Sequence, residues 1–146
     1  MCIRDRVRGP DGYQYEPVWI HPKDAEKRGI ENGDVVKVFN ERGTVLGGAY
    51  LTERVIPGAV HIYHGARHDP IVLGELDRGG AINLITPRNT SSKNVAGLAV
   101  NGFLVEVERA NLDELRKKYP EAFSRPYHQA SGLRFERVLY DGGEQK

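Results

Sequence analysis

The first half of the chain alternates short apolar runs with polar turns that contain glycine. The runs fall at Val18–Ile20, Val35–Phe39, Thr44–Leu51 and Ala59–Tyr63. Short runs rich in β-branched residues and bounded by turn residues predict strands. Gly47 and Gly48 lie inside the third run, which indicates a bulge or a close approach of two backbones. The pattern favours a compact barrel over a parallel sheet with long crossover helices.

One short helix is predicted between the first two strands, at His21–Ile30. Pro22 stands where the first helical residue belongs, and Gly29 can adopt the left-handed conformation that ends a helix. The segment allows only about two turns, so packing must hold it in place. We expect His21 to cap the start of this helix or to pack there.

The middle of the chain is less regular. The stretch His64–Gly80 has no periodicity, and a long irregular stretch inside a compact domain is usually functional or disordered. Ala81–Thr86 is apolar again, and Pro87–Asn94 has the composition of a polar loop.

The C-terminal part combines one more strand with a helix. Phe103–Glu108 alternates cleanly and is predicted to be the closing strand of the barrel. Leu112–Phe123 is predicted to be a helix interrupted by Pro120, and Ser124–Lys146 an irregular tail. These expectations divide the chain into a leading segment at residues 1–15, a barrel at 16–109, and a C-terminal helix with its tail at 110–146.

Composition and charge restrict the class of protein. Charged residues make up 28% and hydrophobic residues 39% of 146 positions, which predicts a soluble globular fold. The net charge of +1 does not support nucleic-acid binding, and no apolar run reaches the roughly 18 residues that a membrane span needs. The single Cys2 excludes an internal disulfide and a cysteine-based zinc site, and it favours a reducing, cytoplasmic location.

The N-terminal residues Met1–Arg6 (MCIRDR) are short and charged, and they lack the apolar core of a signal peptide. We interpret this string as non-native sequence of the kind found at the start of translated environmental DNA. The natural protein is therefore expected to extend upstream of Met1.

The segment Trp19–Ala66 resembles the molybdopterin dinucleotide-binding domain of the dimethyl sulfoxide reductase family. The family's ordered elements are present: HPKDAEKRGI, then ENGDVVKV, an Arg-Gly turn and the run IPGAV. GGAINLIT at Gly79–Thr86 and FLVEVE at Phe103–Glu108 are similar to its later segments. YEPVWIHPKDAEKRGI, HGARHDPI and KYPEAFSRPYHQASGL look most similar to the branch containing pyrogallol–phloroglucinol transhydroxylase large subunits.

The resemblance implies a mainly β fold: a six-stranded double-psi β-barrel with a short inserted helix and a C-terminal helical extension. It implies a molybdenum bis-molybdopterin guanine dinucleotide cofactor, bound between this domain and upstream domains of the same large subunit. An iron–sulfur small subunit is a common partner in the family. The molybdenum ligand lies upstream, so this fragment is expected to supply no catalytic residue and no metal ligand.

Three clusters of hydrogen-bonding residues are candidates for cofactor contact. Backbone amides near glycine, an arginine and amide side chains suit a polar pterin edge and a pyrophosphate. The first cluster is His64–Asp69, the second is Gly79–Thr86 and the third is Arg88–Asn94. The alternatives are an ordinary surface loop for the first cluster, a turn-stabilising amide at Asn83 in the second, and a solvated loop for the third. The candidate residues are His64, Gly65, Ala66, Arg67, Asn83, Thr86, Ser92 and Asn94.

Three other classes of protein compete with this interpretation. A metal enzyme could use His61, His64 and His68, but a strand would point His61 and His64 to opposite faces. A self-processing decarboxylase with this fold needs a Gly-Ser bond, which the sequence lacks. A non-catalytic double-psi barrel adaptor stays open, and an apolar groove with disordered loops at 64–80 and 87–94 would favour it.

Overall fold

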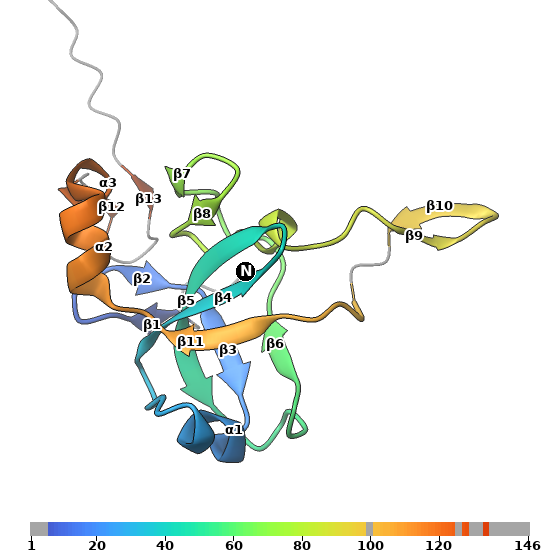
Figure 1. The fold of residues 1–146 in the computed structure, drawn as a ribbon, viewed down its shortest axis with the longest axis horizontal. Coiled ribbons are helices and arrows are strands. Elements are labelled where there is room, and N and C mark those ends of the chain that lie inside the picture. Colours follow the sequence, from blue (N-terminus) through green and yellow to red (C-terminus); the bar gives the residue numbers. More distant parts are fainter. Residues whose placement is uncertain (1–5, 99–100, 125–126, 129–132, 135–146) are drawn as a thin grey trace, which may run out of the picture.

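The computed structural model describes residues 6–98, 101–124, 127–128 and 133–134. Its largest element is a seven-stranded sheet, shown in Figure 1. The strands of this sheet are β3 (Pro17–Ile20), β4 (Val35–Asn40), β5 (Gly43–Leu51), β6 (Val60–Ile62), β7 (Pro70–Val72), β8 (Leu76–Asp77) and β11 (Glu106–Arg109).

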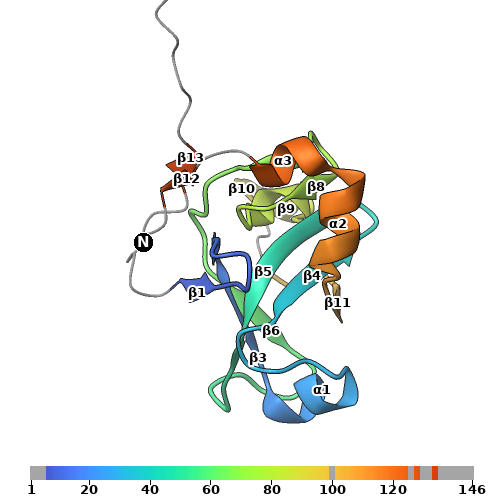
Figure 2. The ribbon, with the colours of Figure 1, turned by 90° about the vertical axis from the view of Figure 1, so that its left-hand side faces the viewer.

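Three small two-stranded sheets and four short helical segments complete the described fold (Figures 1 and 2). The small sheets pair β1 (Val7–Arg8) with β2 (Gln14–Tyr15), β9 (Thr90–Ser92) with β10 (Val95–Leu98), and β12 (Tyr127–His128) with β13 (Leu133–Arg134). The helices are α1 (Pro22–Lys27), the 3₁₀ turn η2 (Ile82–Leu84), α2 (Leu112–Lys118) and α3 (Pro120–Ser124). In the described part of the chain, no helix is long and apolar enough to cross a membrane.

The central strand of the large sheet is β5. It forms a tight hairpin with β4, in which Asn40 pairs with Gly43, and it pairs in parallel with β3 and with β8. The outer strands are β11 beside β4 and β6 beside β3. Mainly β structure is therefore confirmed, whereas the described strands form an open sheet in which β11 and β6 are not paired with each other.

At Gly47 and Gly48 in β5 there is no room for a side chain. A Cβ atom at Gly47 would collide with the Val18 side chain, and one at Gly48 would collide with Val7. The β4–β5 register contains no bulge, and the glycines make room mainly for side chains of β3 and of the N-terminal strand β1. Side chains of the sheet, of α1 and of the segment around η2 form one apolar core. Its buried residues are Val18, Ile20, Ala25, Ile30, Val36, Val38, Val45, Ala49, Ile62, Ile85 and Val107.

The predicted helix forms, in a shorter version. The His21 side chain accepts a hydrogen bond from the Lys23 backbone N–H at 3.2 Å, and Pro22 is the first helical residue. Gly29 has φ +62°, which confirms it as the left-handed stop. Asp24 reaches beyond the helix, because its carboxylate accepts the Gly58 backbone N–H at 2.6 Å.

Two of the stretches predicted to be irregular contain strands. The His64–Gly80 stretch includes β7 and β8, and β8 is held in parallel register with β5 through the Thr44–Leu76 pair. The predicted loop Pro87–Asn94 contains β9, which forms a hairpin with β10. Both predictions were wrong because strands of two or three residues are too short to show alternation. Whether such a segment forms a strand depends on the strand with which it pairs.

Of the C-terminal predictions, the helix is confirmed, the strand is shorter than predicted, and the tail predicted to be irregular contains the described pair β12 and β13. The helix predicted at Leu112–Phe123 is present as α2 and α3, which are separated at Pro120 as expected from its missing N–H. The predicted closing strand Phe103–Glu108 begins later, at Glu106, and it pairs with β4. Most of the predicted tail Ser124–Lys146 lies outside the described residues.

Candidate cofactor-binding site

The first candidate cluster lies on an exposed segment directly after β6. His64, Gly65 and Arg67 are exposed, and Ala66 is half-buried. Gly65 has φ +88°, and a Cβ placed there would meet nothing within 4 Å. The backbone of this segment is therefore open on one side, so that a ligand could contact its amides closely.

The second candidate cluster, around η2, lies beside the first. A Cβ atom at Gly79 would collide with the Arg67 carbonyl oxygen, so the two segments touch through their backbones. The Arg78 backbone N–H donates to the Asp69 carbonyl oxygen at 2.9 Å. The structure thus brings the segments 64–69 and 79–86 together, although several residues separate them in sequence.

Asn83 is exposed at the middle of η2. Its side chain is therefore open to a ligand. Thr86 is half-buried, and its hydroxyl donates to the Ile82 carbonyl oxygen at 2.8 Å. The Thr86 hydroxyl consequently stabilises the turn and keeps only its acceptor capacity for a ligand.

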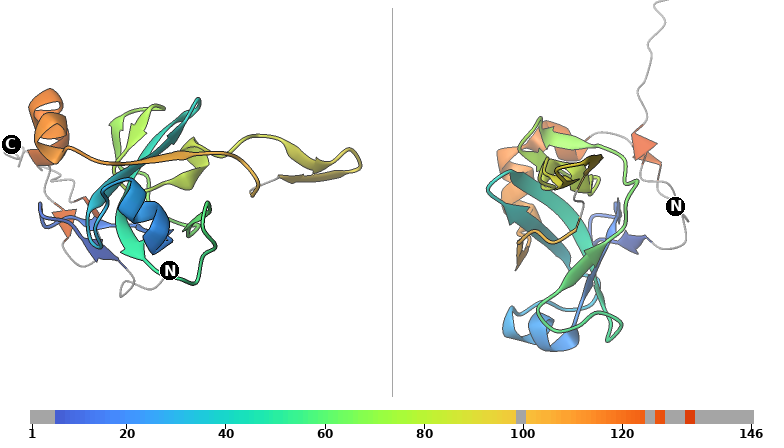
Figure 3. Two further views of the ribbon diagram at one scale, coloured as in Figure 1. Left: turned by 60° about the horizontal axis from the view of Figure 1, so that its bottom comes forward. Right: turned by 90° about the vertical axis from the view of Figure 1, so that its right-hand side faces the viewer.

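The third candidate cluster is not brought to the other two. Ser92 and Asn94 belong to the β9–β10 hairpin, which extends away from the large sheet in Figures 1 and 3. Both residues are exposed, and the Ser92 hydroxyl oxygen accepts the Asn94 backbone N–H at 3.1 Å. Any contact that they make with a cofactor must occur at a distance from η2.

Buried polar side chains contact both of the first two clusters. The sequence did not indicate this network. Arg78 forms an ion pair with Asp11 at 2.8 Å, and its guanidinium lies 4.1 Å from the Tyr13 ring centre and 4.4 Å from that of Phe123. The Tyr13 hydroxyl donates to the Asp69 carboxylate at 2.9 Å. The only sequence signal was the alternation of Tyr13 and Tyr15 within the segment 1–15, where both side chains are fully buried.

Burial of the two tyrosines affects their ionisation. Desolvation, followed by the nearby Asp69 carboxylate, raises the pKa of Tyr13 far above its ordinary value of 10.0. Desolvation also raises the pKa of Tyr15, an effect that the Arg78 cation opposes and the Asp11 carboxylate reinforces. Both hydroxyls therefore stay protonated in the folded chain well above the pH at which they would ionise in an unfolded one.

We expect the free energy of unfolding to fall steeply under alkaline conditions. Since the folded-state pKa values of Tyr13 and Tyr15 are raised, the stabilisation is fully present below about pH 10 and is lost as the pH rises further. Urea unfolding measured between about pH 8 and about pH 12 tests this. Tyr13→Phe should flatten the decline, whereas Tyr50→Phe, at a side chain 43% exposed, should leave it unchanged. Equal profiles for all three proteins would contradict the expectation.

The histidines of this region do not gather into a metal site in the structure. Within the described ranges, no group of three or more histidine, cysteine and acidic side chains is placed to hold a metal ion. Asp69 instead accepts the Tyr13 hydroxyl, and His68 lies 3.6 Å from the Asp77 carboxylate.

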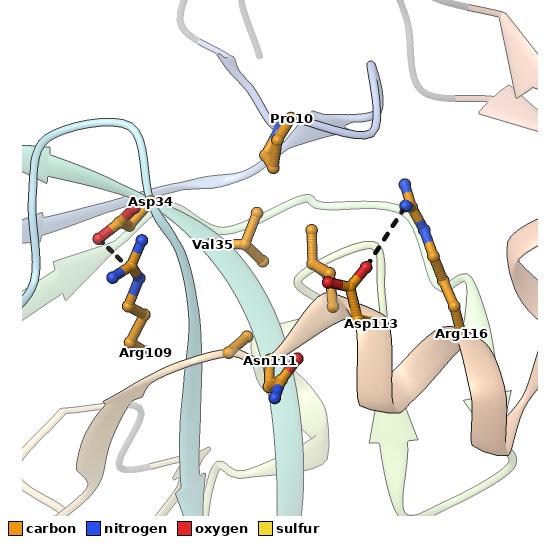
Figure 4. Close-up of a pocket in the computed structure, with 9 residues that line it drawn as sticks. Pro10, Asp34, Val35, Arg109, Asn111, Asp113 and Arg116 are labelled. Atoms are coloured by element: carbon orange, nitrogen blue, oxygen red, sulfur yellow. Dashed lines mark ion pairs between the residues drawn. The ribbon is translucent and has the colours of Figure 1, made fainter.

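A separate pocket of about 480 Å³ lies between α2, β11 and the β1–β2 turn (Figure 4). Two ion pairs border it, Arg109–Asp34 at 3.2 Å and Arg116–Asp113 at 3.9 Å. Each arginine is matched by a carboxylate, and none of the eight candidate residues lines the pocket. It therefore offers little reason to place an anionic cofactor there.

Comparison with known proteins identifies the family of the chain. Residues 4–99 match the family model described as "Molydopterin dinucleotide binding domain". The chain therefore belongs to the molybdopterin dinucleotide-binding domain family, and its relatives are enzymes of the dimethyl sulfoxide reductase family. This membership supports a molybdenum cofactor that carries a molybdopterin dinucleotide.

The relatives are much longer proteins. The pyrogallol hydroxytransferase large subunit of Pelobacter acidigallici is 42% identical over 115 residues, which cover 77% of this chain and 13% of that protein. Trimethylamine-N-oxide reductase of Haemophilus influenzae is 43% identical over 98 residues, 64% of this chain and 12% of the relative. Trimethylamine-N-oxide reductase 1 of Escherichia coli O157:H7 is 46% identical over 99 residues, with coverages of 66% and 12%. The chain thus spans about an eighth of each.

The exposed groups of segments 64–69 and 79–86 fit a polar, anionic dinucleotide. His64, Arg67 and His68 are exposed and carry N–H donors, which suit phosphate and pterin oxygen atoms. The carboxylates of Asp69 and Asp77 are buried, where they accept hydrogen bonds from the protein itself. These carboxylates are therefore not exposed beside the donors, where they would repel an anionic ligand.

Proposed function

We propose that this chain is the C-terminal cofactor-binding part of a molybdenum oxidoreductase or hydroxytransferase large subunit. In this proposal it binds bis-molybdopterin guanine dinucleotide through hydrogen bonds from the segments 64–69 and 79–86. The observation that carries the proposal is the backbone contact between these two glycine-containing segments. Their hydrogen-bond donors are exposed, and buried contacts of Asp69 and Arg78 hold the segments in place. Family membership supplies the class of ligand.

Each candidate residue has a role that its position allows. Arg67 and His64 would pair with phosphate or pterin oxygens, and Gly65 with Ala66 would offer backbone amides. Asn83 would donate and accept at the polar pterin edge. When bound, the metal and its dithiolenes supply the electron-transfer and oxygen-transfer chemistry. The residues of this chain hold and orient the ligand.

Three further candidates play lesser parts in the proposal. Thr86 would act mainly by keeping the η2 turn in shape, because its hydroxyl is used within the turn. Ser92 and Asn94 would contact a more distant part of the cofactor or of the subunit, since their hairpin extends outward.

The remainder of the large subunit would cover an exposed aromatic face. Trp19, Tyr50 and His61 lie side by side on three neighbouring strands, and Tyr63 packs edge-on against Trp19 and His61. Tyr50 is 43% and Tyr63 39% exposed, and exposed apolar patches commonly mark contact surfaces. We propose that upstream domains cover this face, and an iron–sulfur small subunit stays a prediction.

We also propose that the sheet belongs to a six-stranded double-psi barrel. Parallel pairing of β5 with β3 and with β8, alongside its antiparallel hairpin with β4, suits such a barrel. The segment before β11 lines a pocket of about 200 Å³ together with β6 and η2, through Phe103, Val105, Ile62 and Ile82. The outer strand β6 and the segment that leads into the other outer strand, β11, therefore border the same pocket.

The adaptor alternative gains no support from the loops. An adaptor was expected to have a disordered stretch at 64–80, whereas two strands and the contacts of Asp69 and Arg78 hold that stretch in place. Structured polar segments of this kind suit a ligand better than an apolar peptide.

The test is to recover the full-length gene, purify its product and assay bound molybdenum and guanine nucleotide. We expect both in the wild-type protein, and about tenfold weaker retention in Asn83→Ala, from the loss of one or two hydrogen bonds to a charged ligand. Asn32→Ala is the matched control, because Asn32 stabilises a turn by accepting the Leu51 N–H at 2.9 Å. It should lower stability and leave retention unchanged.

Two outcomes would count against the proposal. A full-length protein without molybdenum and guanine nucleotide would remove the cofactor assignment. Equal losses of cofactor in Asn83→Ala and Asn32→Ala would remove the role of Asn83, since general destabilisation would then account for both.

A further inference from the structure

Asp77 is a fully buried carboxylate at the end of β8, with 0% of its surface exposed. Acidic side chains are rarely buried to this extent unless hydrogen bonds satisfy the charge. This residue is not among the candidates for cofactor contact, and its burial prevents direct contact with a ligand. Its role therefore depends on the backbone groups that donate hydrogen bonds to it.

The two carboxylate oxygens of Asp77 bind the two candidate segments. One oxygen accepts the backbone N–H of Asp69, at the end of segment 64–69, at 2.7 Å. The other accepts the backbone N–H of Ala81, directly before η2, at 2.9 Å. A single side chain thus connects the segment that carries Arg67 to the one that carries Asn83.

The surroundings of Asp77 make this connection stiff. Charge-assisted hydrogen bonds from backbone amides are short and stronger than neutral ones. Asp69 is fixed a second time, since its own carboxylate accepts the Tyr13 hydroxyl at 2.9 Å. The His68 imidazole, 49% exposed, lies 3.6 Å from the same Asp77 oxygen that accepts the Asp69 amide, so it links the buried carboxylate to the surface.

We propose that Asp77 is the positioning residue of the cofactor site. It sets the spacing between the donors of segment 64–69 and the Asn83 side chain, so that both can act on one ligand molecule. This inference rests on the proposed function. It adds a residue whose effect on the cofactor passes entirely through two backbone amides.

Asp77→Asn in the full-length subunit is the direct test. The asparagine keeps the shape and one acceptor, but its NH₂ group then faces a backbone N–H, so one of the two connections is lost. We expect hydrogen exchange at the Asp69 or Ala81 amide of the cofactor-free protein to become about 10- to 100-fold faster. Retention of molybdenum and guanine nucleotide should fall about tenfold or more.

Asp34→Asn is the matched control. Asp34 also accepts a backbone N–H, that of Glu31 at 2.9 Å, and pairs with Arg109, but at a turn away from both candidate segments. Cofactor loss in Asp77→Asn that exceeds the loss in Asp34→Asn at an equal drop in Tm supports positioning. Equal retention in the two variants would overturn the inference and leave Asp77 with a structural role alone.

Ala81→Pro provides a second variant that retains the Asp77 charge. Ala81 has φ −69°, which proline adopts, and proline lacks the N–H that Asp77 binds. Reduced retention here, with normal exchange elsewhere, supports the inference, and unchanged retention contradicts it. Failure of the proposed function is recognised separately, because the wild-type subunit would then contain no cofactor at all.

Discussion

Replacing Arg78 with alanine is expected to destabilise the chain by about 3–5 kcal/mol, the usual effect of removing one partner of a buried ion pair. The Arg78 and Asp11 side chains are 3% and 2% exposed, so the Asp11 carboxylate would be left without its guanidinium in a low-dielectric interior. The Tyr13 and Phe123 rings would also lose the cation that lies between them. Urea unfolding of the purified variant measures the effect.

Arg78→Lys should recover only part of this loss, since an ammonium group cannot stack between two rings and bind Asp11 in the same geometry. Arg116→Ala is the surface control. The Arg116 side chain is 45% exposed and lies 3.9 Å from Asp113, and such pairs contribute about 0–1 kcal/mol. Similar losses for Arg78→Ala and Arg116→Ala would show that the buried pair is not important for stability.

Gly79→Ala is expected to separate the two candidate segments. The new methyl group would collide with the Arg67 carbonyl oxygen, which belongs to the backbone and cannot rotate away. Overpacking of this kind costs about 1–3 kcal/mol, and relief requires one segment to shift. We expect lower stability, measured by urea unfolding, together with reduced retention of molybdenum and guanine nucleotide in the full-length protein.

Gly74→Ala separates crowding from backbone strain. Gly74 lies on the turn between β7 and β8 with φ +79°, and a Cβ there would meet nothing within 4 Å. Its alanine variant should cost about 1–2 kcal/mol through the left-handed conformation alone. Cofactor retention should then stay normal. A loss of cofactor in Gly74→Ala equal to that in Gly79→Ala would refute the crowding argument.

The parts of the fold that local rules determine could be predicted from the sequence. The helix after His21 carries its start and stop residues within ten positions, so α1 was found with its cap and its terminating Gly29. The interruption at Pro120 follows from the chemistry of one residue. The need for Gly47 and Gly48 followed from their place inside an apolar run.

The parts that depend on distant partners could not be predicted. β8 is two residues long, and it is a strand because Thr44 of β5 pairs with Leu76. The outer strand β11 begins at Glu106 because its register is set by β4. The arrangement of the outer strands likewise depends on long-range pairing, and alternation within a short segment carries no information about it.

The candidate site shows the same division. Arg67 and Asn83 were chosen as candidates because their residue types and glycine neighbours suit a polar ligand, and the structure leaves both side chains exposed. The supporting residues Tyr13, Asp77 and Arg78 were missed, because a buried tyrosine or carboxylate looks like any surface residue until its partners are known. Their roles come from contacts that span the chain, such as Tyr13 with Asp69.

The buried contacts around Arg78 also bear on when the site can form. They join Asp11 near the beginning of the described chain to Phe123 near its end, and β11 joins the sheet by pairing with β4. Contacts between distant parts of a chain form late and slowly in folding. During synthesis, the segments around Arg67 and Asn83 therefore lack their full support until α3 has left the ribosome. Under the proposed function, we expect cofactor insertion to follow the synthesis of α3.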